Sequence, residues 1–103
     1  MFHNNKMHRT VLATVLALAG GAAQAQISDD VVRIGVMNDA SGPYSGAGGS
    51  GWVLAARMAI EDFGGKVNGK NIELVSVDDQ NKPDVGLAAA RKWIDTDKVD
   101  TIV

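Results

Sequence analysis

The sequence contains no cysteine, which excludes disulfide bonds, thiolate catalysis and cysteine-based zinc sites. Its two histidines, His3 and His8, both lie at the extreme N-terminus, so the rest of the chain cannot build a histidine-based catalytic pair or metal site. Neither sign of charge is in large excess, because ten basic residues stand against twelve acidic ones and the formal net charge is -2. That balance gives no electrostatic reason to expect a nucleic-acid partner or an anionic membrane surface.

The first 25 residues have the pattern of a signal peptide. Lys6 and Arg9 precede an uncharged apolar stretch over 10–23, which is too short to span a bilayer as a mature helix. Ala23-Gln24-Ala25 then forms a small-x-small cleavage site. We therefore expect residues 1–25 to be removed after Ala25 and the mature protein to be periplasmic. No cysteine follows the apolar stretch and no twin-arginine pair precedes it, so we expect export as an unfolded chain without a lipid anchor.

The rest of the chain alternates between strand and helix patterns. Continuous β-branched and apolar residues predict strands, and apolar residues at helical spacing predict helices. The expected order is a strand over 31–37, a helix over 52–63, an Asn-Gly turn at 68–69, a strand over 72–77, a helix over 85–97 with Pro83 in its first turn, and a strand over 99–103.

This order predicts an α/β fold built on a β-α-β-α-β parallel sheet. Crossovers through helices join parallel strands and are right-handed, which gives the strand order 2-1-3 with the first strand in the middle. Ligands of such sheets bind at the carboxyl ends of the strands, beside the point where the order reverses. The loops over 38–51 and 78–82 meet at that point.

The loop after the first strand contains the spacing G-x-G-x-x-G at Gly46, Gly48 and Gly51. In a dinucleotide-binding fold the first glycine follows the strand almost at once, whereas here Asn38 to Ser45 intervene. The acid that would meet the ribose is Asp78, which lies farther along the chain than the fingerprint requires. No G-K-[ST] follows, and an exported chain does not carry a cytoplasmic nucleotide with it. We therefore predict no nucleotide cofactor.

The same loop carries polar groups beside the expected start of a helix. Ser41, Tyr44 and Ser45 supply hydroxyls, and the helix N-terminus supplies free N–H groups and a positive dipole end, which together suit a carboxylate or another small polar ligand. A tyrosine adds an apolar ring with a polar tip. A loop that is only structural remains the alternative.

Two further pairs of residues are given structural roles. Asp78 and Asp79 resemble a metal-binding pair, but the pattern offers no third ligand, so we expect strand-end and cap groups, with Asp79 orienting the 38–51 loop. Trp52 and Trp93 are expected to pack in the core rather than to contact ligand. We predict neither a metal site nor a catalytic residue.

Several motifs in fixed order resemble the start of the leucine-type periplasmic solute-binding proteins of ABC transporters. They are "IGV…SGPYS…G", "AARMAIEDFGG", "VNGKNIELVSVDDQNKPD" and "AARKWI", and they cover 31–103. The resemblance implies a type I periplasmic binding protein, in which two α/β lobes close on a ligand cleft. Residues 26–103 would then be a partial N-terminal lobe, and the chain a truncated protein not expected to bind solute tightly by itself.

The resemblance also implies a site and partners. Tyr44 and Ser45 are the expected solute contacts, with Asp39 and Ser41 behind them. Leucine binders place an aromatic residue where this chain has Ala47. The motifs "SGPYSG…AIEDFGG…DDQNK" are more similar to those of binders of aromatic acids, amides or related solutes. The implied function is that of a non-enzymatic importer component that takes an amino acid, aromatic acid or amide to an ABC permease. A ligand-sensing receptor domain and, less in keeping with the loop, an α/β oxidoreductase are the alternatives.

Overall fold

The computed structural model describes residues 26–103, so the predicted signal peptide lies outside the described residues. The elements in chain order are β1 (Val32–Asn38), α1 (Gly49–Phe63), β2 (Lys66–Val67), β3 (Lys70–Asp78), α2 (Pro83–Asp95) and β4 (Thr101–Ile102). Within this described part, neither helix has the length and apolar character needed to cross a bilayer.

The strands form a sheet in the order β2-β3-β1-β4. β1 pairs in parallel with both β3 and β4, which confirms the predicted α/β fold and the position of the first strand in the middle. β2 was not predicted. It pairs antiparallel with β3 through a two-residue turn at Asn68 and Gly69, whose φ angles of 49° and 78° are the positive values that a type I′ hairpin requires.

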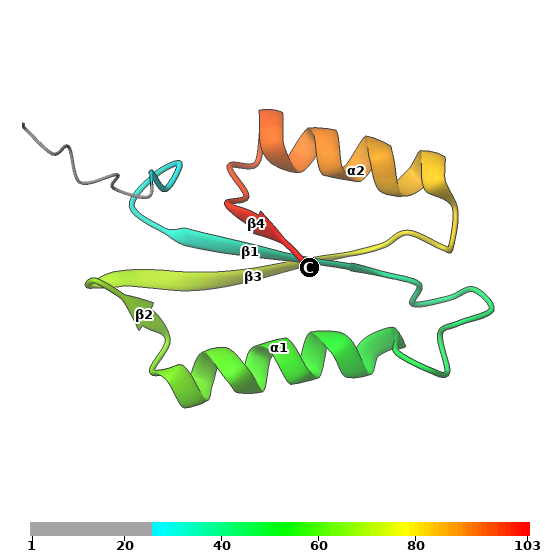
Figure 1. The fold of residues 1–103 in the computed structure, drawn as a ribbon, viewed down its shortest axis with the longest axis horizontal. Coiled ribbons are helices and arrows are strands. Elements are labelled where there is room, and N and C mark those ends of the chain that lie inside the picture. Colours follow the sequence, from blue (N-terminus) through cyan, green and yellow to red (C-terminus); the bar gives the residue numbers. More distant parts are fainter. Residues whose placement is uncertain (1–25) are drawn as a thin grey trace, which may run out of the picture.

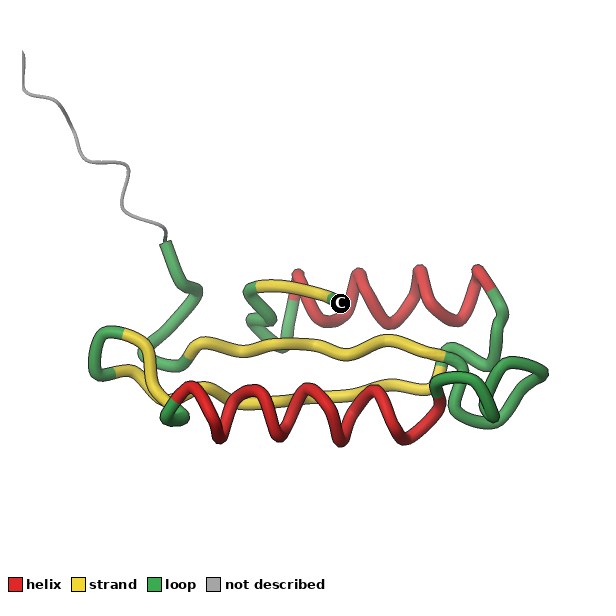
Figure 2. Tube along the Cα trace, turned by 60° about the horizontal axis from the view of Figure 1, so that its bottom comes forward, coloured by secondary structure: helices red, strands yellow, loops and turns green. Residues whose placement is uncertain are grey.

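The two helices cover opposite faces of the sheet (Figure 1). The crossover from β1 to β3 and the crossover from β3 to β4 run in opposite directions across the sheet, so right-handed connections place α1 and α2 on different sides. Figure 2 shows the same layers from below, with α1 in front of the strands. The result is a three-layer arrangement whose middle strand is β1.

The core includes both faces of the middle strand β1, because Gly35 faces Trp93 of α2 whereas Val36 shares the α1 face with Ile34. Val36 on β1 is 1% exposed, and Trp93 and Val99 are each 7% exposed. A side chain at Gly35 would meet the Trp93 ring at 2.5 Å, so the glycine leaves the space that the indole fills. The prediction that Trp93 packs in the core is confirmed.

Arg33 anchors the opposite end of the sheet from the 38–51 loop. Its Nε donates to Glu73 at 2.8 Å, and its Nη1 lies 3.3 Å from Asp29. The Asp100 carboxylate accepts the backbone N–H groups of Ser28 and Arg33, both at 2.8 Å. The bond from the Arg33 N–H is the main cause that lowers the pKa of Asp100. These contacts fasten the segment before β1 to the strand end.

Candidate functional site

The loop between β1 and α1 is folded back on itself by backbone bonds. The Ser45 N–H donates to Gly42 O at 3.2 Å, and the Ala47 N–H donates to Tyr44 O at 2.9 Å. Asp39, at the start of the loop, is 9% exposed, and its carboxylate accepts the N–H of Gly42 and, at 2.8 Å, that of Tyr44. Asp39, predicted as a solute contact, therefore organises the loop through its side chain.

Asp78 fixes the same loop from the neighbouring strand. Its Oδ1 accepts the N–H of Ala40 and that of Gln80, each at 2.9 Å. A hydrogen bond from the Ser41 side chain is the largest of the effects that lower the pKa of Asp78, ahead of these two backbone donors. Asp79, predicted to orient the loop, bonds it only through its main chain, since its N–H donates to Asn38 O at 3.0 Å. Its side chain accepts the N–H of Asn81 in its own turn at 2.8 Å. The parallel register of β1 and β3 brings Asp78 beside Asn38 and so within reach.

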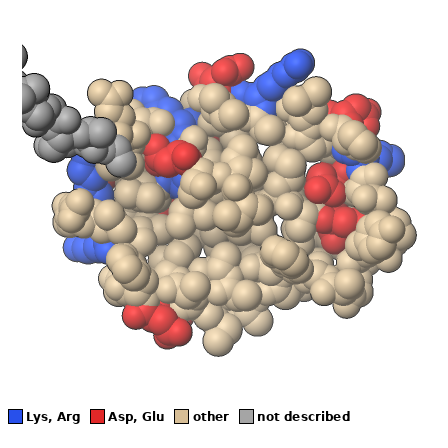
Figure 3. All heavy atoms as spheres, viewed as in Figure 1, with Lys and Arg blue, Asp and Glu red and all other residues tan. Residues whose placement is uncertain are grey.

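The structure also supplies the third carboxylate that the sequence pattern did not show. Oxygens of Asp39, Asp78 and Asp79 all lie within 4.8 Å of one another. Each carboxylate accepts at least one backbone N–H, so the three acids act as turn and strand-end groups. Figure 3 shows acidic side chains at the end of the molecule where the loop lies.

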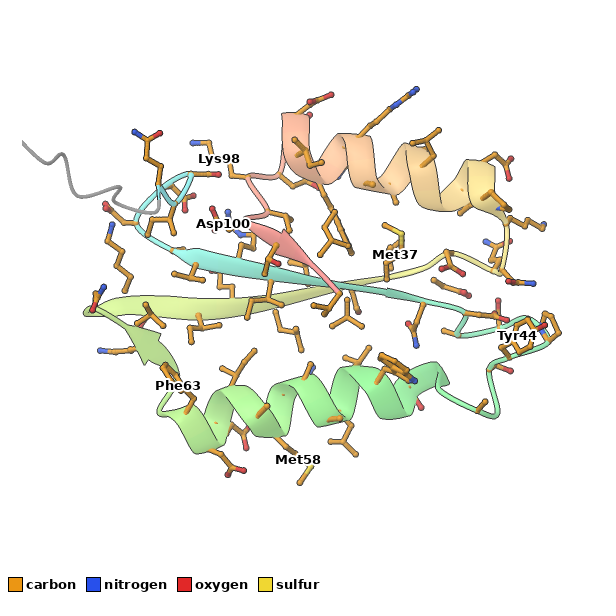
Figure 4. The ribbon with its side chains drawn as sticks, in the orientation of Figure 1. Met37, Tyr44, Met58, Phe63, Lys98 and Asp100 are labelled. Atoms are coloured by element: carbon orange, nitrogen blue, oxygen red, sulfur yellow. The ribbon has the colours of Figure 1, made fainter. Side chains whose placement is uncertain are left out.

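A hollow of about 250 Å³ opens beside the loop at the carboxyl end of β1. Its lining includes Asn38, Asp39, Tyr44, Ala47, Gly48 and Trp52. The position agrees with the expectation that ligands bind at the carboxyl ends of the strands. Tyr44 is 63% exposed and lies in the outer part of the loop (Figure 4).

Of the four predicted site residues, the hollow brings together Asp39 and Tyr44. Ser45 is half-buried and Ser41 is exposed, and neither belongs to its lining. The hydroxyl of Ser41 turns instead to Asp78. A residue type in a loop pattern does not distinguish a side chain that bonds its own backbone from one that faces a ligand, because both need the same polar atoms.

Trp52 lines the hollow, contrary to the prediction that it packs in the core. The side chain is 58% exposed, although it lies in the first turns of α1. Helical periodicity placed Trp52 alongside the apolar stripe. Periodicity does not show that the first turn of α1 leaves the side chain of Trp52 exposed instead of packing it on the sheet. Asn38 was also missed, and its Nδ2 donates to Gly49 O and so ties the start of α1 to the end of β1.

The glycines of the loop have structural roles that do not involve a nucleotide. Gly49 has φ of +40°, and a Cβ at Gly48 would overlap the indole of Trp52. Gly46 and Gly51 face open space. The N–H groups of Ala47 and Gly48 both donate to Tyr44 O, at 2.9 and 3.3 Å, whereas a pyrophosphate loop leaves such groups free for phosphate oxygens.

A second, larger hollow of about 450 Å³ lies between α1 and the strands β1 and β3. Ser50, Val53 and Arg57 line it from the helix, and Ser76 and Asp78 line it from β3. The two hollows share Asn38 and Gly49, so the start of α1 separates them.

Comparison with known proteins identifies the family and the fold. A family model described as periplasmic binding protein matches residues 31–103, which include every described helix and strand. The chain belongs to the periplasmic binding protein family. A curated amino acid binding protein of Pseudomonas aeruginosa is 30% identical over 98 residues, which cover 90% of this chain and 25% of that protein.

Solved periplasmic binding proteins share the arrangement. A periplasmic binding protein from Burkholderia mallei is 48% identical with a TM-score of 0.69, over 71% of this chain and 20% of its own. A branched-chain amino acid ABC transporter periplasmic ligand-binding protein from Burkholderia xenovorans LB400 is 49% identical with a TM-score of 0.66, over 69% and 19%. A solute-binding protein of an ABC transporter from Rhodopseudomonas palustris BisB5, in complex with 3,4-dihydroxybenzoic acid, is 30% identical with a TM-score of 0.65, over 72% and 20%.

These relatives confirm the resemblance and the type I fold predicted from the sequence. The chain spans about a fifth to a quarter of the length of the relatives it matches.

Proposed function

We propose that residues 26–103 form part of the N-terminal lobe of an extracytoplasmic solute-binding protein that serves an ABC importer. The observation that supports this proposal is the hollow at the carboxyl end of β1, lined by the exposed side chains of Tyr44 and Trp52. A concave surface with aromatic walls and a few polar groups is the usual form of a small-molecule site. Membership of the periplasmic binding protein family supports a role in solute binding.

The proposed mechanism is reversible closure of two lobes around the solute. Four donors of the 39–48 loop bond two acids: Asp39 accepts the N–H groups of Gly42 and Tyr44, and Asp78 accepts the N–H of Ala40 and the side chain of Ser41. These bonds would fix one wall of the cleft before the solute arrives. A wall ordered in advance reduces the entropy lost on binding. Hinge closure of a second lobe would complete the site, and the closed form would deliver the solute to the permease.

The solute class proposed is a small organic molecule with an acid or amide group: an amino acid, an aromatic acid or an amide. Isothermal titration of the complete product of the reading frame that encodes this chain tests it, with L-leucine, 3,4-dihydroxybenzoate and benzamide as probes. We expect one of the three to bind one-to-one with a Kd in the micromolar range or tighter. Absence of binding by all three at millimolar concentration would contradict the proposal. Residues 26–103 by themselves, with only one wall, are expected to bind none of them tightly.

Residues 1–25 are proposed to be a signal peptide cleaved after Ala25. Expression of the chain with these residues in a bacterial host, followed by mass spectrometry of the periplasmic fraction, tests the assignment. The expected product begins at Gln26. A product that retains residues 1–25, or that stays in the cytoplasm, would contradict it.

A further inference from the structure

Trp52 is an exposed aromatic side chain on the wall of the hollow. Its exposed fraction is 58%, and that of Tyr44 on the same hollow is 63%. Burying a tryptophan contributes more to stability than burying most other side chains, since it removes a large apolar area from water. Two large rings that line one hollow offer a small ligand an apolar contact at a concave surface.

The indole of Trp52 is held in place by the backbone beside it. A Cβ at Gly48 would overlap the indole Nε1 and lie 2.5 Å from its Cδ1, so the five-membered ring lies against the α-carbon of this glycine. Any other residue at position 48 would displace the ring. Ala47, also in the lining, adds only a methyl group and leaves the space in front of the loop open.

The volume of the hollow is sufficient for an aromatic ring. It measures about 250 Å³, and an apolar protein cavity of about 150 Å³ accommodates benzene. A substituted six-membered ring therefore fits beside Trp52. Aromatic rings in such contact prefer offset-stacked or edge-to-face arrangements, and these add affinity beyond the area that they bury.

We propose that Trp52 is a specificity-determining residue that selects solutes carrying a planar aromatic ring. This inference rests on the proposed solute-binding function and deepens it. Tyr44 faces the same hollow, and its hydroxyl offers a hydrogen bond to a polar substituent of the ring. Gly48 serves the same purpose indirectly, because it positions the indole.

The test compares variants of the complete reading-frame product by isothermal titration with 3,4-dihydroxybenzoate and with L-leucine. We expect Trp52→Ala to weaken binding of the aromatic acid about fivefold or more, and Trp52→Phe to retain most of the affinity. Met58→Ala is the matched control, since Met58 is 54% exposed on the same helix and does not line the hollow. Thermal unfolding of each variant verifies that it is folded.

Tryptophan fluorescence supplies a second readout that a merely structural role would not change. Trp93 is buried and does not line the hollow, so the part of the quenching by a bound aromatic acid that is lost in Trp52→Phe comes from Trp52. Binding of leucine but not of 3,4-dihydroxybenzoate, or aromatic-acid binding that Trp52→Ala leaves within twofold of the original, would overturn the inference and leave the proposed function standing. Binding of neither solute, nor of benzamide, would contradict the proposed function itself.

Discussion

Adding a single methyl group at Gly35 should lower the stability of the fold. A Cβ there would meet Trp93 Cζ3 at 2.5 Å and Cε3 at 2.7 Å, and the ring is buried between α2 and the sheet. Gly35→Ala is therefore expected to destabilise the fold by about 1–3 kcal/mol through overpacking. Urea unfolding followed by Trp93 fluorescence measures the change.

Gly46→Ala is the matched control for that substitution. Gly46 has open space around its α-carbon and does not have a positive φ. Its replacement should change the unfolding free energy by less than about 0.5 kcal/mol. Equal effects of the two substitutions would contradict the packing assigned to Trp93.

Asp78 should make the loop sensitive to acid. Its pKa is lowered by the Ser41 side chain and by the N–H groups of Ala40 and Gln80, which favour the charged form. A carboxyl with a lowered folded-state pKa stabilises the fold above its ordinary pKa, and the contribution is lost as the pH falls through the folded-state value. Asp78→Asn should therefore lower Tm at pH 7 and reduce the further drop in Tm between pH 5 and pH 2.

The control for that pH series is Glu61→Gln, which changes an exposed acid on α1. Its Tm profile should follow the unsubstituted protein. If Asp78→Asn showed the same acid-induced drop in Tm as the unsubstituted protein, the role assigned to Asp78 would be wrong. Asp29 and Asp100, whose pKa values are also lowered mainly by backbone N–H groups, account for acid sensitivity that remains.

The four predicted site residues were correctly placed in one loop. The sequence did not show which of their side chains face outward and which bond the loop itself. The order of the residues predicts a loop at a strand end, and the family resemblance predicts a ligand there. Which side chain faces outward depends on the fold of the loop, in which Asp39 and Asp78 accept backbone N–H groups. Trp52 was missed because its neighbours at helical spacing are apolar.

The ends of α1 depend on glycines in two different ways. Gly64, which follows the helix, has φ of 104°, and its N–H donates to Glu61 O at 3.0 Å. Gly51 lies inside the helix with open space around it. Gly64→Ala is expected to destabilise by about 1 kcal/mol because a left-handed residue with a Cβ is strained, whereas Gly51→Ala is expected to stabilise by about 0.5 kcal/mol.

Thermal and urea unfolding of both variants test this pair of opposite effects. The third glycine of the G-x-G-x-x-G spacing would be essential in a dinucleotide loop, where it allows close packing of helix and strand. Loss of stability in Gly51→Ala would contradict the open surroundings of this residue.

The elements were predicted well in type and less well at their boundaries. α1 begins at Gly49 instead of Trp52, because the weak helix formers Gly49, Ser50 and Gly51 obscure its start. β2 has two residues, too few for a periodic pattern, although the turn beside it was predicted. The last strand, predicted over 99–103, is recognised only at Thr101–Ile102, but Val103 still bonds Gly35 and Met37 at 2.8 Å.

The topology of the whole molecule followed from the order of periodic segments. Alternating strands and helices, joined by right-handed crossovers, allow few arrangements, and the predicted one is observed. The cleft side of the sheet follows from the same rule, since both loops at the carboxyl ends lie together. The solute and the permease do not follow from topology, because they depend on surfaces that relatives about four to five times longer contribute.

The claim that the 39–52 segment is one wall of a solute cleft is tested most directly by amide hydrogen exchange. The complete reading-frame product is compared with and without a saturating amount of whichever probe solute binds in the titrations. We predict slower exchange in peptides covering 39–52, and unchanged exchange in the β2–β3 turn over 66–70, which lies at the other end of the sheet (Figure 1). Unchanged exchange over 39–52 at saturation would contradict the account.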